Sequence, residues 1–150
     1  MIPNLTGIKY THEDLMDFIN CLNFENGKYD MLWGRDETLL SALVLGALGG
    51  VGSTYNYAAP LYMDLINAFN EGQLTRAREL QQMAVNMIML LGKYGGIPTG
   101  KAYMRYIGFD CGPFRLPFKN MNKDEYAKFA SDVRHLKMEK YFSKYDHIEN

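Results

Sequence analysis

Three short segments of this chain carry side chains suited to binding or transforming a small molecule, and each comes at or after the end of an apolar run. The first is Lys9, which ends the run 5–9. The second is Gly34-Arg35-Asp36-Glu37, and the third is the glycine-rich stretch 49–56, which contains Ser53. If the apolar runs are parallel strands, the three segments meet at one end of a sheet, where (β/α) barrels gather their chemistry.

Lys9 is a candidate nucleophile. Its neighbours Ile8 and Tyr10 are largely apolar, so we expect its amine to be held away from water. Burial disfavours a charged ammonium, which makes the neutral amine accessible. A neutral amine attacks a keto carbon to form a Schiff base. The alternative is an ordinary solvated lysine just past a strand, which is the commoner occurrence.

The other two segments also have two interpretations each. The adjacent carboxylates Asp36 and Glu37 can accept hydrogen bonds from the hydroxyls of a polyol, or they can simply favour the first turn of a helix. In the run Gly52-Ser53-Thr54, glycine lets the backbone approach a ligand, and exposed amides at such a turn can hold a carboxylate or phosphate. The alternative is a plain tight turn.

Strands and helices alternate through the first third of the chain. We expect strands over 5–9, 29–33 and 49–52. Helical periodicity covers about 12–22, with Thr11 or His12 as the cap, and resumes at Asp36. This order indicates βαβ units and a parallel sheet.

The rest of the chain has a helical pattern only. We expect helices over about 61–69 (ended by Gly72), 80–91 (ended by Gly95-Gly96), 99–107 and 122–138, with an irregular crossing over 108–120. Asn122 and Glu125 have the spacing of a capping box. The polar segment 141–150 is expected to be loosely held.

The composition describes one ordinary globular domain. The chain has 150 residues, 47 % hydrophobic residues and a formal net charge of -1. We expect no nucleic-acid partner, no membrane span and no secretory leader. Cys21 and Cys111 lack metal-ligand spacing, so we expect reduced thiols in a cytoplasmic protein. The three histidines are scattered, and we expect neither a metal site nor a cofactor.

Together the three segments resemble a known enzyme family. The runs Gly7-Ile8-Lys9-Tyr10-Thr11, Trp33-Gly34-Arg35-Asp36-Glu37 and Gly50-Val51-Gly52-Ser53-Thr54-Tyr55-Asn56 are similar to the second half of the N-acetylneuraminate lyases. These belong to the dihydrodipicolinate synthase superfamily of pyruvate-dependent class I aldolases. The resemblance continues through Gly112-Pro113-Phe114-Arg115-Leu116-Pro117 and covers essentially the whole chain.

The resemblance implies an α/β fold that is the C-terminal part of a TIM (β/α)8 barrel. Residues 1–56 would supply the sixth, seventh and eighth strands with their connecting helices. Residues 57–150 would supply the last barrel helix and a C-terminal helical extension of the same domain. The family's barrel is about twice as long as this chain. Its carboxylate-binding turn after the second strand and its fifth-strand tyrosine cannot be assigned in this sequence.

The resemblance also implies roles for individual residues. Lys9 would form the Schiff base with pyruvate or open-chain N-acetylneuraminate, and the products of cleavage would be N-acetylmannosamine and pyruvate. The positions that would shape the sugar site or bind the sugar are Thr11, Gly34 (through its backbone), Asp36, Glu37 and Ser53. The family needs no cofactor and commonly forms homotetramers.

Two alternatives stay open. The chain is either part of such a lyase or a non-catalytic assembly unit, whose open sheet edges pair with another copy or with a complementary barrel half. A pyruvate aldolase of the synthase type would keep Lys9 but use a different second substrate.

Overall fold

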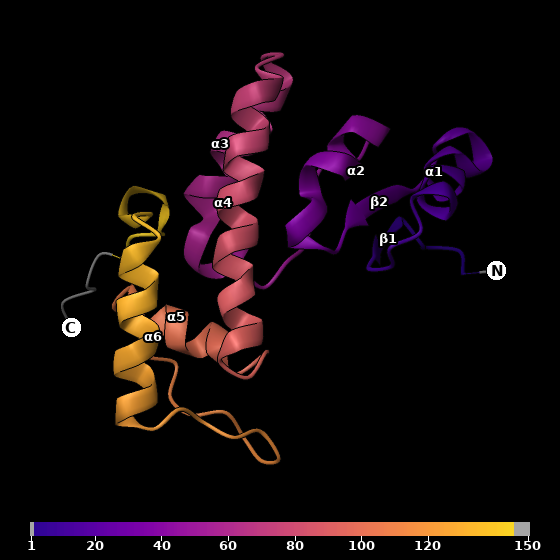
Figure 1. Cartoon of the computed structure of the whole chain (residues 1–150). Coiled ribbons are helices and arrows are strands. Elements are labelled where there is room, and N and C mark those ends of the chain that lie inside the picture. The colour runs from indigo at the N-terminus through magenta and orange to yellow at the C-terminus, as the bar shows by residue number, and fades with distance from the viewer. Residues whose placement is uncertain (1, 146–150) are drawn as a thin grey trace.

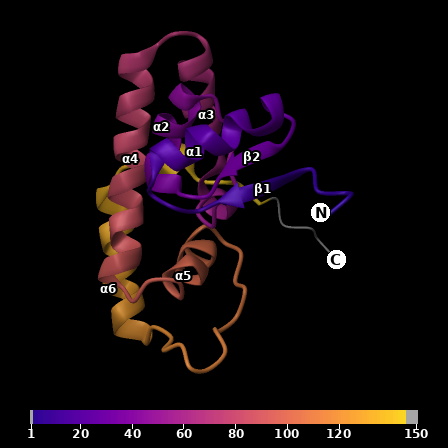
Figure 2. The same ribbon diagram turned by 90° about the vertical axis from the view of Figure 1, so that its right-hand side faces the viewer.

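The computed structural model describes residues 2–145, which form a strand-bearing arm attached to a larger helical part (Figure 1). The arm contains β1 (Gly7–Tyr10), α1 (Leu15–Asn23), η1 (Phe24–Asn26), β2 (Asp30–Trp33), η2 (Asp36–Thr38) and α2 (Leu39–Leu45). The helical part contains α3 (Tyr55–Asn70), α4 (Leu74–Lys93), α5 (Thr99–Tyr106), α6 (Lys123–His135) and η3 (Glu139–Tyr141). The turned view in Figure 2 shows α5 and the irregular segment 108–120 near the C-terminal end of α4. Within the described part of the chain, no helix is long and apolar enough to cross a membrane.

The sheet is parallel but smaller than expected. β1 pairs with β2 in a register that sets Gly7 opposite Asp30 and Tyr10 opposite Trp33. These two strands and α1 confirm one βαβ unit. The third strand expected over 49–52 is only a single parallel bridge between Trp33 and Gly50. A Cβ at Gly50 would lie 2.9 Å from the Trp33 carbonyl oxygen, so only glycine fits this close to β2. Glycines have no side chain to pack against the sheet, which disfavours a longer strand here.

Two helix ends differ from the expectation for physical reasons. α1 starts at Leu15, because the Asp14 carboxylate accepts hydrogen bonds from the amides of Met16 and Asp17, each at 3.0 Å. Neither Thr11 nor His12 caps it, so that prediction was wrong. α6 ends at His135 rather than near 138, and Lys137 then adopts a left-handed φ of 54°.

The capping box of α6 is confirmed. The backbone amide of Asn122 donates to Glu125 Oε2 at 2.8 Å, and the amide of Glu125 donates to Asn122 Oδ1 at 2.9 Å. Burial does not shape this exposed end, so the local hydrogen bonds alone determine where α6 starts.

Helices α3 and α4 pack along each other and form the centre of the core. Their inward faces bury Leu61, Leu65, Leu80, Ala84 and Met87 completely. A second group lies in the arm, where the rings of Tyr10, Phe18 and Trp33 contact one another.

The segment after α6 is part of the core, which contradicts the expectation of a loose tail. Tyr141 and Phe142 are buried. The amide of Ser143 donates to the Tyr57 carbonyl oxygen at 2.8 Å, and Arg76 donates to the Tyr141 hydroxyl. The expectation also covered residues 146–150, which lie outside the described residues.

We therefore predict that Phe142→Ala lowers the free energy of unfolding by about 3 kcal/mol, because it removes a buried ring that contacts Tyr103 and Tyr106. Phe24→Ala is the matched control, since Phe24 is 58 % exposed and its loss should cost under about 1 kcal/mol. Urea denaturation measures both values. Equal effects would contradict the packing of Phe142 in the core.

Candidate active site

All six residues selected from the sequence line one cavity, of about 280 Å³, at the carboxyl ends of β1 and β2. They are Lys9, Thr11, Gly34, Asp36, Glu37 and Ser53. Arg35, Gly52 and Thr54 complete the strand-end side, and Ile88 and Leu91 of α4 form the opposite wall. We call this cavity the lysine cavity. It lies between the three segments and α4, a helix that the sequence did not connect with them.

The Lys9 side chain is exposed, so the expectation that apolar neighbours shield its amine from water was wrong. Among the described residues β1 has one strand neighbour, β2, which leaves its other edge open. Ile8, the expected shield, is itself 42 % exposed.

Gly34 allows Lys9 and Thr11 to lie across the turn that follows β2. Its amide donates to the Tyr10 carbonyl oxygen at 2.7 Å, which brings the two strand ends together. A Cβ at this position would lie 2.9 Å from Lys9 Cε and would overlap Thr11 Oγ1. Any side chain at position 34 would therefore displace two cavity residues.

The Asp36 carboxylate is buried and bonded within the protein. It accepts hydrogen bonds from the Thr54 amide at 3.0 Å and from the Thr54 hydroxyl at 2.5 Å. The Thr54 hydroxyl also lies 2.7 Å from the Tyr62 hydroxyl. Since Thr54 has one hydroxyl hydrogen and gives it to the carboxylate, Tyr62 supplies the hydrogen of the second contact. Asp36 thereby fixes the turn that presents Ser53.

Helix α4 is attached to the same turn through Gln81. Its side-chain amide donates to the Asp36 carbonyl oxygen at 3.2 Å, and its Oε1 accepts from the Leu40 amide at 2.9 Å. Thr54 and Gln81 hold the turns of the cavity in place but were not among the candidate site residues selected from the sequence. No local signal marks them, because their partners lie 18 to 45 residues away.

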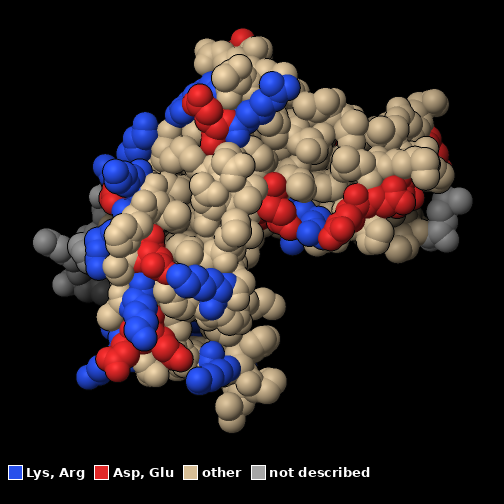
Figure 3. Space-filling view, viewed as in Figure 1, with Lys and Arg blue, Asp and Glu red and all other residues tan. Residues whose placement is uncertain are grey.

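Glu37 is oriented by Arg35. The guanidinium donates to Glu37 Oε1 from two nitrogens, at 3.1 Å and 2.8 Å, and to Glu13 Oε1 at 2.6 Å. Both bonds to Glu37 use the same oxygen, so Oε2 keeps its capacity to accept hydrogen bonds from a ligand. Figure 3 shows a basic patch between acidic patches along the lower edge of the arm, above the recess between the arm and the lower part of the molecule.

Tyr55 and Tyr62, whose ring centroids lie 4.4 Å apart, keep their hydroxyl protons, although the Tyr55 hydroxyl has no hydrogen-bond partner among the described residues. Burial raises the pKa of Tyr62, and the negative charge of Asp36 adds to the effect. Burial also raises the pKa of Tyr55, with Asp36 and Glu37 contributing. Both hydroxyls therefore stay protonated at ordinary pH.

In the part of the chain that the structure describes, no three His, Cys, Asp or Glu side chains come together as a metal site.

Known proteins match this chain in sequence and in structure. N-acetylneuraminate lyase of Mus musculus is 37 % identical over 140 residues, which cover 90 % of this chain and 43 % of that protein. The solved N-acetylneuraminate lyase of Proteus mirabilis has a TM-score of 0.86 at 39 % identity and covers 90 % of this chain and 46 % of its own. The lyase of Fusobacterium nucleatum, solved in complex with pyruvate, has a TM-score of 0.77 at 26 % identity, with 91 % and 44 % covered.

The chain thus spans less than half the length of these relatives. The chain corresponds to the C-terminal half of the proteins of a superfamily of barrel aldolases. Its α/β structure agrees with part of such a barrel. The family model of the dihydrodipicolinate synthetases matches residues 1–136, and the chain belongs to the dihydrodipicolinate synthetase family.

Proposed function

We propose that this chain carries the Schiff-base lysine and the sugar-binding turns of an N-acetylneuraminate lyase. The reaction is the reversible cleavage of N-acetylneuraminate to N-acetylmannosamine and pyruvate. The main observation in support is that Lys9 and the five other selected residues, from three separate segments of the chain, line one cavity. The lyases among the relatives, one of them solved with pyruvate, support this choice of chemistry.

In the proposed reaction, Lys9 attacks the keto carbon of open-chain N-acetylneuraminate as the free amine, after its ammonium has given a proton to water. Loss of water from the adduct, with uptake of one proton, gives an iminium. The iminium accepts the electron pair of the bond beyond the pyruvyl methylene. That bond breaks, the sugar hydroxyl gives up its proton as the aldehyde forms, and an enamine remains. Protonation of the enamine carbon and hydrolysis, which returns the water lost earlier, release pyruvate and Lys9.

The sugar-facing roles are unequal. Glu37 has an oxygen available and Ser53 is exposed at the cavity, so both suit direct hydrogen bonds to hydroxyls. Thr11 would shape the site from the turn after β1, and Gly34 would contribute its backbone. Asp36 is already bonded twice to Thr54, so we assign it chiefly to holding Ser53 in place. None of these positions is assigned to the pyruvyl carboxylate. We propose that the enzyme is a homo-oligomer, as the resemblance implies.

A non-catalytic assembly role is the second candidate. β1 has an open edge in the described structure, and apolar side chains of the arm are exposed, with Ile8 at 42 % and Met16 at 73 %. An open strand edge beside apolar surface favours pairing with another chain. Self-association without imine formation would favour this role over the lyase.

We predict that incubation with pyruvate and borohydride adds a reduced pyruvate adduct to Lys9, because reduction traps the imine irreversibly. Intact mass and peptide mapping locate it. Lys9→Arg should abolish the adduct, since a guanidinium forms no such imine, and borohydride without pyruvate is the blank. An adduct on a different lysine, or none at all, would count against Lys9 as the nucleophile of this chain.

We predict that Glu37→Gln weakens the binding of N-acetylmannosamine about tenfold, because it replaces the charged acceptor of sugar hydroxyls. Formation of the pyruvate adduct at Lys9 should be unchanged. Isothermal titration measures the first effect, and mass spectrometry the second.

The matched control is Glu79→Gln. Glu79 also forms an ion pair, with Arg76 at 3.0 Å, but lies outside the lysine cavity. Unchanged sugar binding in Glu37→Gln, with the adduct retained, would instead favour an aldolase of the synthase type.

A further inference from the structure

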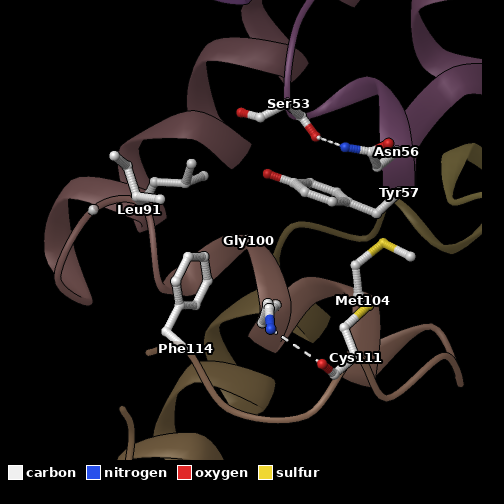
Figure 4. Close-up of a pocket in the computed structure, with 11 residues that line it drawn as sticks. Ser53, Asn56, Tyr57, Leu91, Gly100, Met104, Cys111 and Phe114 are labelled. Carbon is white, nitrogen blue, oxygen red and sulfur yellow. Dashed lines mark hydrogen bonds between the residues drawn. The ribbon is translucent and has the colours of Figure 1, made fainter. Parts of the chain in front are cut away.

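A second and larger pocket, of about 800 Å³, adjoins the lysine cavity and shares Ser53 and Leu91 with it. It lies between the start of α3, the end of α4, α5 and the segment 108–120, and is here called the Tyr57 pocket (Figure 4). Its volume falls in the range that holds small organic ligands. Apart from Ser53, no residue of its lining has a role in the proposed lyase steps.

The pocket contains a buried hydroxyl that needs a partner. Tyr57 is 1 % exposed, and its hydroxyl has no hydrogen-bond partner among the described residues. Figure 4 shows the hydroxyl directed into the pocket, between Ser53 and Leu91. The ring is held there by stacking on Tyr103, with centroids 4.5 Å apart and planes within 6°. Burial raises the pKa of Tyr57, so the group stays a donor in search of an acceptor.

The walls favour a neutral, largely apolar ligand. The lining includes the apolar side chains of Leu91, Ile97, Met104 and Phe114. Lys101 is the one charged residue of the lining. Its ammonium donates to the carbonyl oxygens of Cys111 at 3.1 Å and Pro113 at 2.9 Å and lies 4.9 Å from the Phe114 ring centroid. That charge is already compensated by the loop it holds, so an anion gains little here.

We propose that the Tyr57 pocket binds a neutral small molecule with an apolar or aromatic body and a carboxamide oxygen that accepts the Tyr57 hydroxyl hydrogen. A carbonyl oxygen is a strong acceptor without charge, which matches the buried, unpaired Tyr57 hydroxyl beside a lysine whose ammonium already donates to two loop carbonyls. The proposal involves neither Lys9 nor a keto group, so it stands or falls separately from the lyase chemistry.

Gly100 provides a means to close the pocket without disturbing the fold. It lines the pocket in α5, and a Cβ built there meets no atom within 4 Å. Leucine is a better helix former than glycine, so Gly100→Leu should fill the pocket while retaining α5. Gly92 in α4 is the matched control, because it is equally open but lies outside the pocket and is exposed.

The test is titration of the complete chain with acetanilide, a neutral aromatic amide, followed by saturation-transfer NMR. Wild type and Gly92→Leu should bind it at one site with equal affinity, and Gly100→Leu should bind at least tenfold more weakly. Absence of binding to wild type, or equal affinities for the two leucine variants, would overturn the proposal.

Tyr57→Phe tests the donor itself, since it keeps the stacked ring and removes only the hydroxyl. We expect acetanilide to bind about three- to tenfold more weakly. Propylbenzene, which has a similar body and no acceptor, should bind wild type and Tyr57→Phe alike. An equal loss for both ligands, or no loss for either, would refute the hydrogen bond to Tyr57.

Discussion

The buried carboxylate of Asp36 is the contact on which the rest of the site depends. Its two hydrogen bonds from Thr54 join the turn after β2 to the start of α3, and its backbone carbonyl accepts from Gln81 of α4. A buried charge is tolerated only where donors surround it, so these partners cannot be separated without exposing or orphaning the carboxylate. The strand-bearing arm is thereby held to the helices that complete the cavity wall.

Much of the fold was predictable because its signals are local. The βαβ order, the long apolar faces of α3 and α4 and the capping box at Asn122 all follow from residues within a few positions of one another. The strand over 49–52 and the loose tail failed because distant contacts decide them: 49–52 forms a bridge, and Phe142 is buried by a core assembled from remote helices. The cap of α1 failed for a local reason, because the Asp14 carboxylate accepts from the amides of Met16 and Asp17.

The sequence could predict that these residues share a cavity, but not the contacts that each of them makes there. The strand-end rule brought Lys9, Asp36 and Ser53 to one cavity, since parallel strands end at one edge. It could not indicate that Lys9 would be exposed, because exposure depends on which strands flank β1. Nor could it indicate that Asp36 binds Thr54 or that the Tyr57 hydroxyl is unpaired, because both depend on how α3 packs.

Gly52 restricts how the turn before α3 can vary. A Cβ there would overlap the Asp36 carboxylate, so any larger residue requires that carboxylate to move away from its bonds to Thr54. Ser53, one residue later, is exposed at the cavity and free of that restriction. Variation at Ser53 therefore leaves the contact between Asp36 and Thr54 intact, whereas a side chain at position 52 would have to displace it.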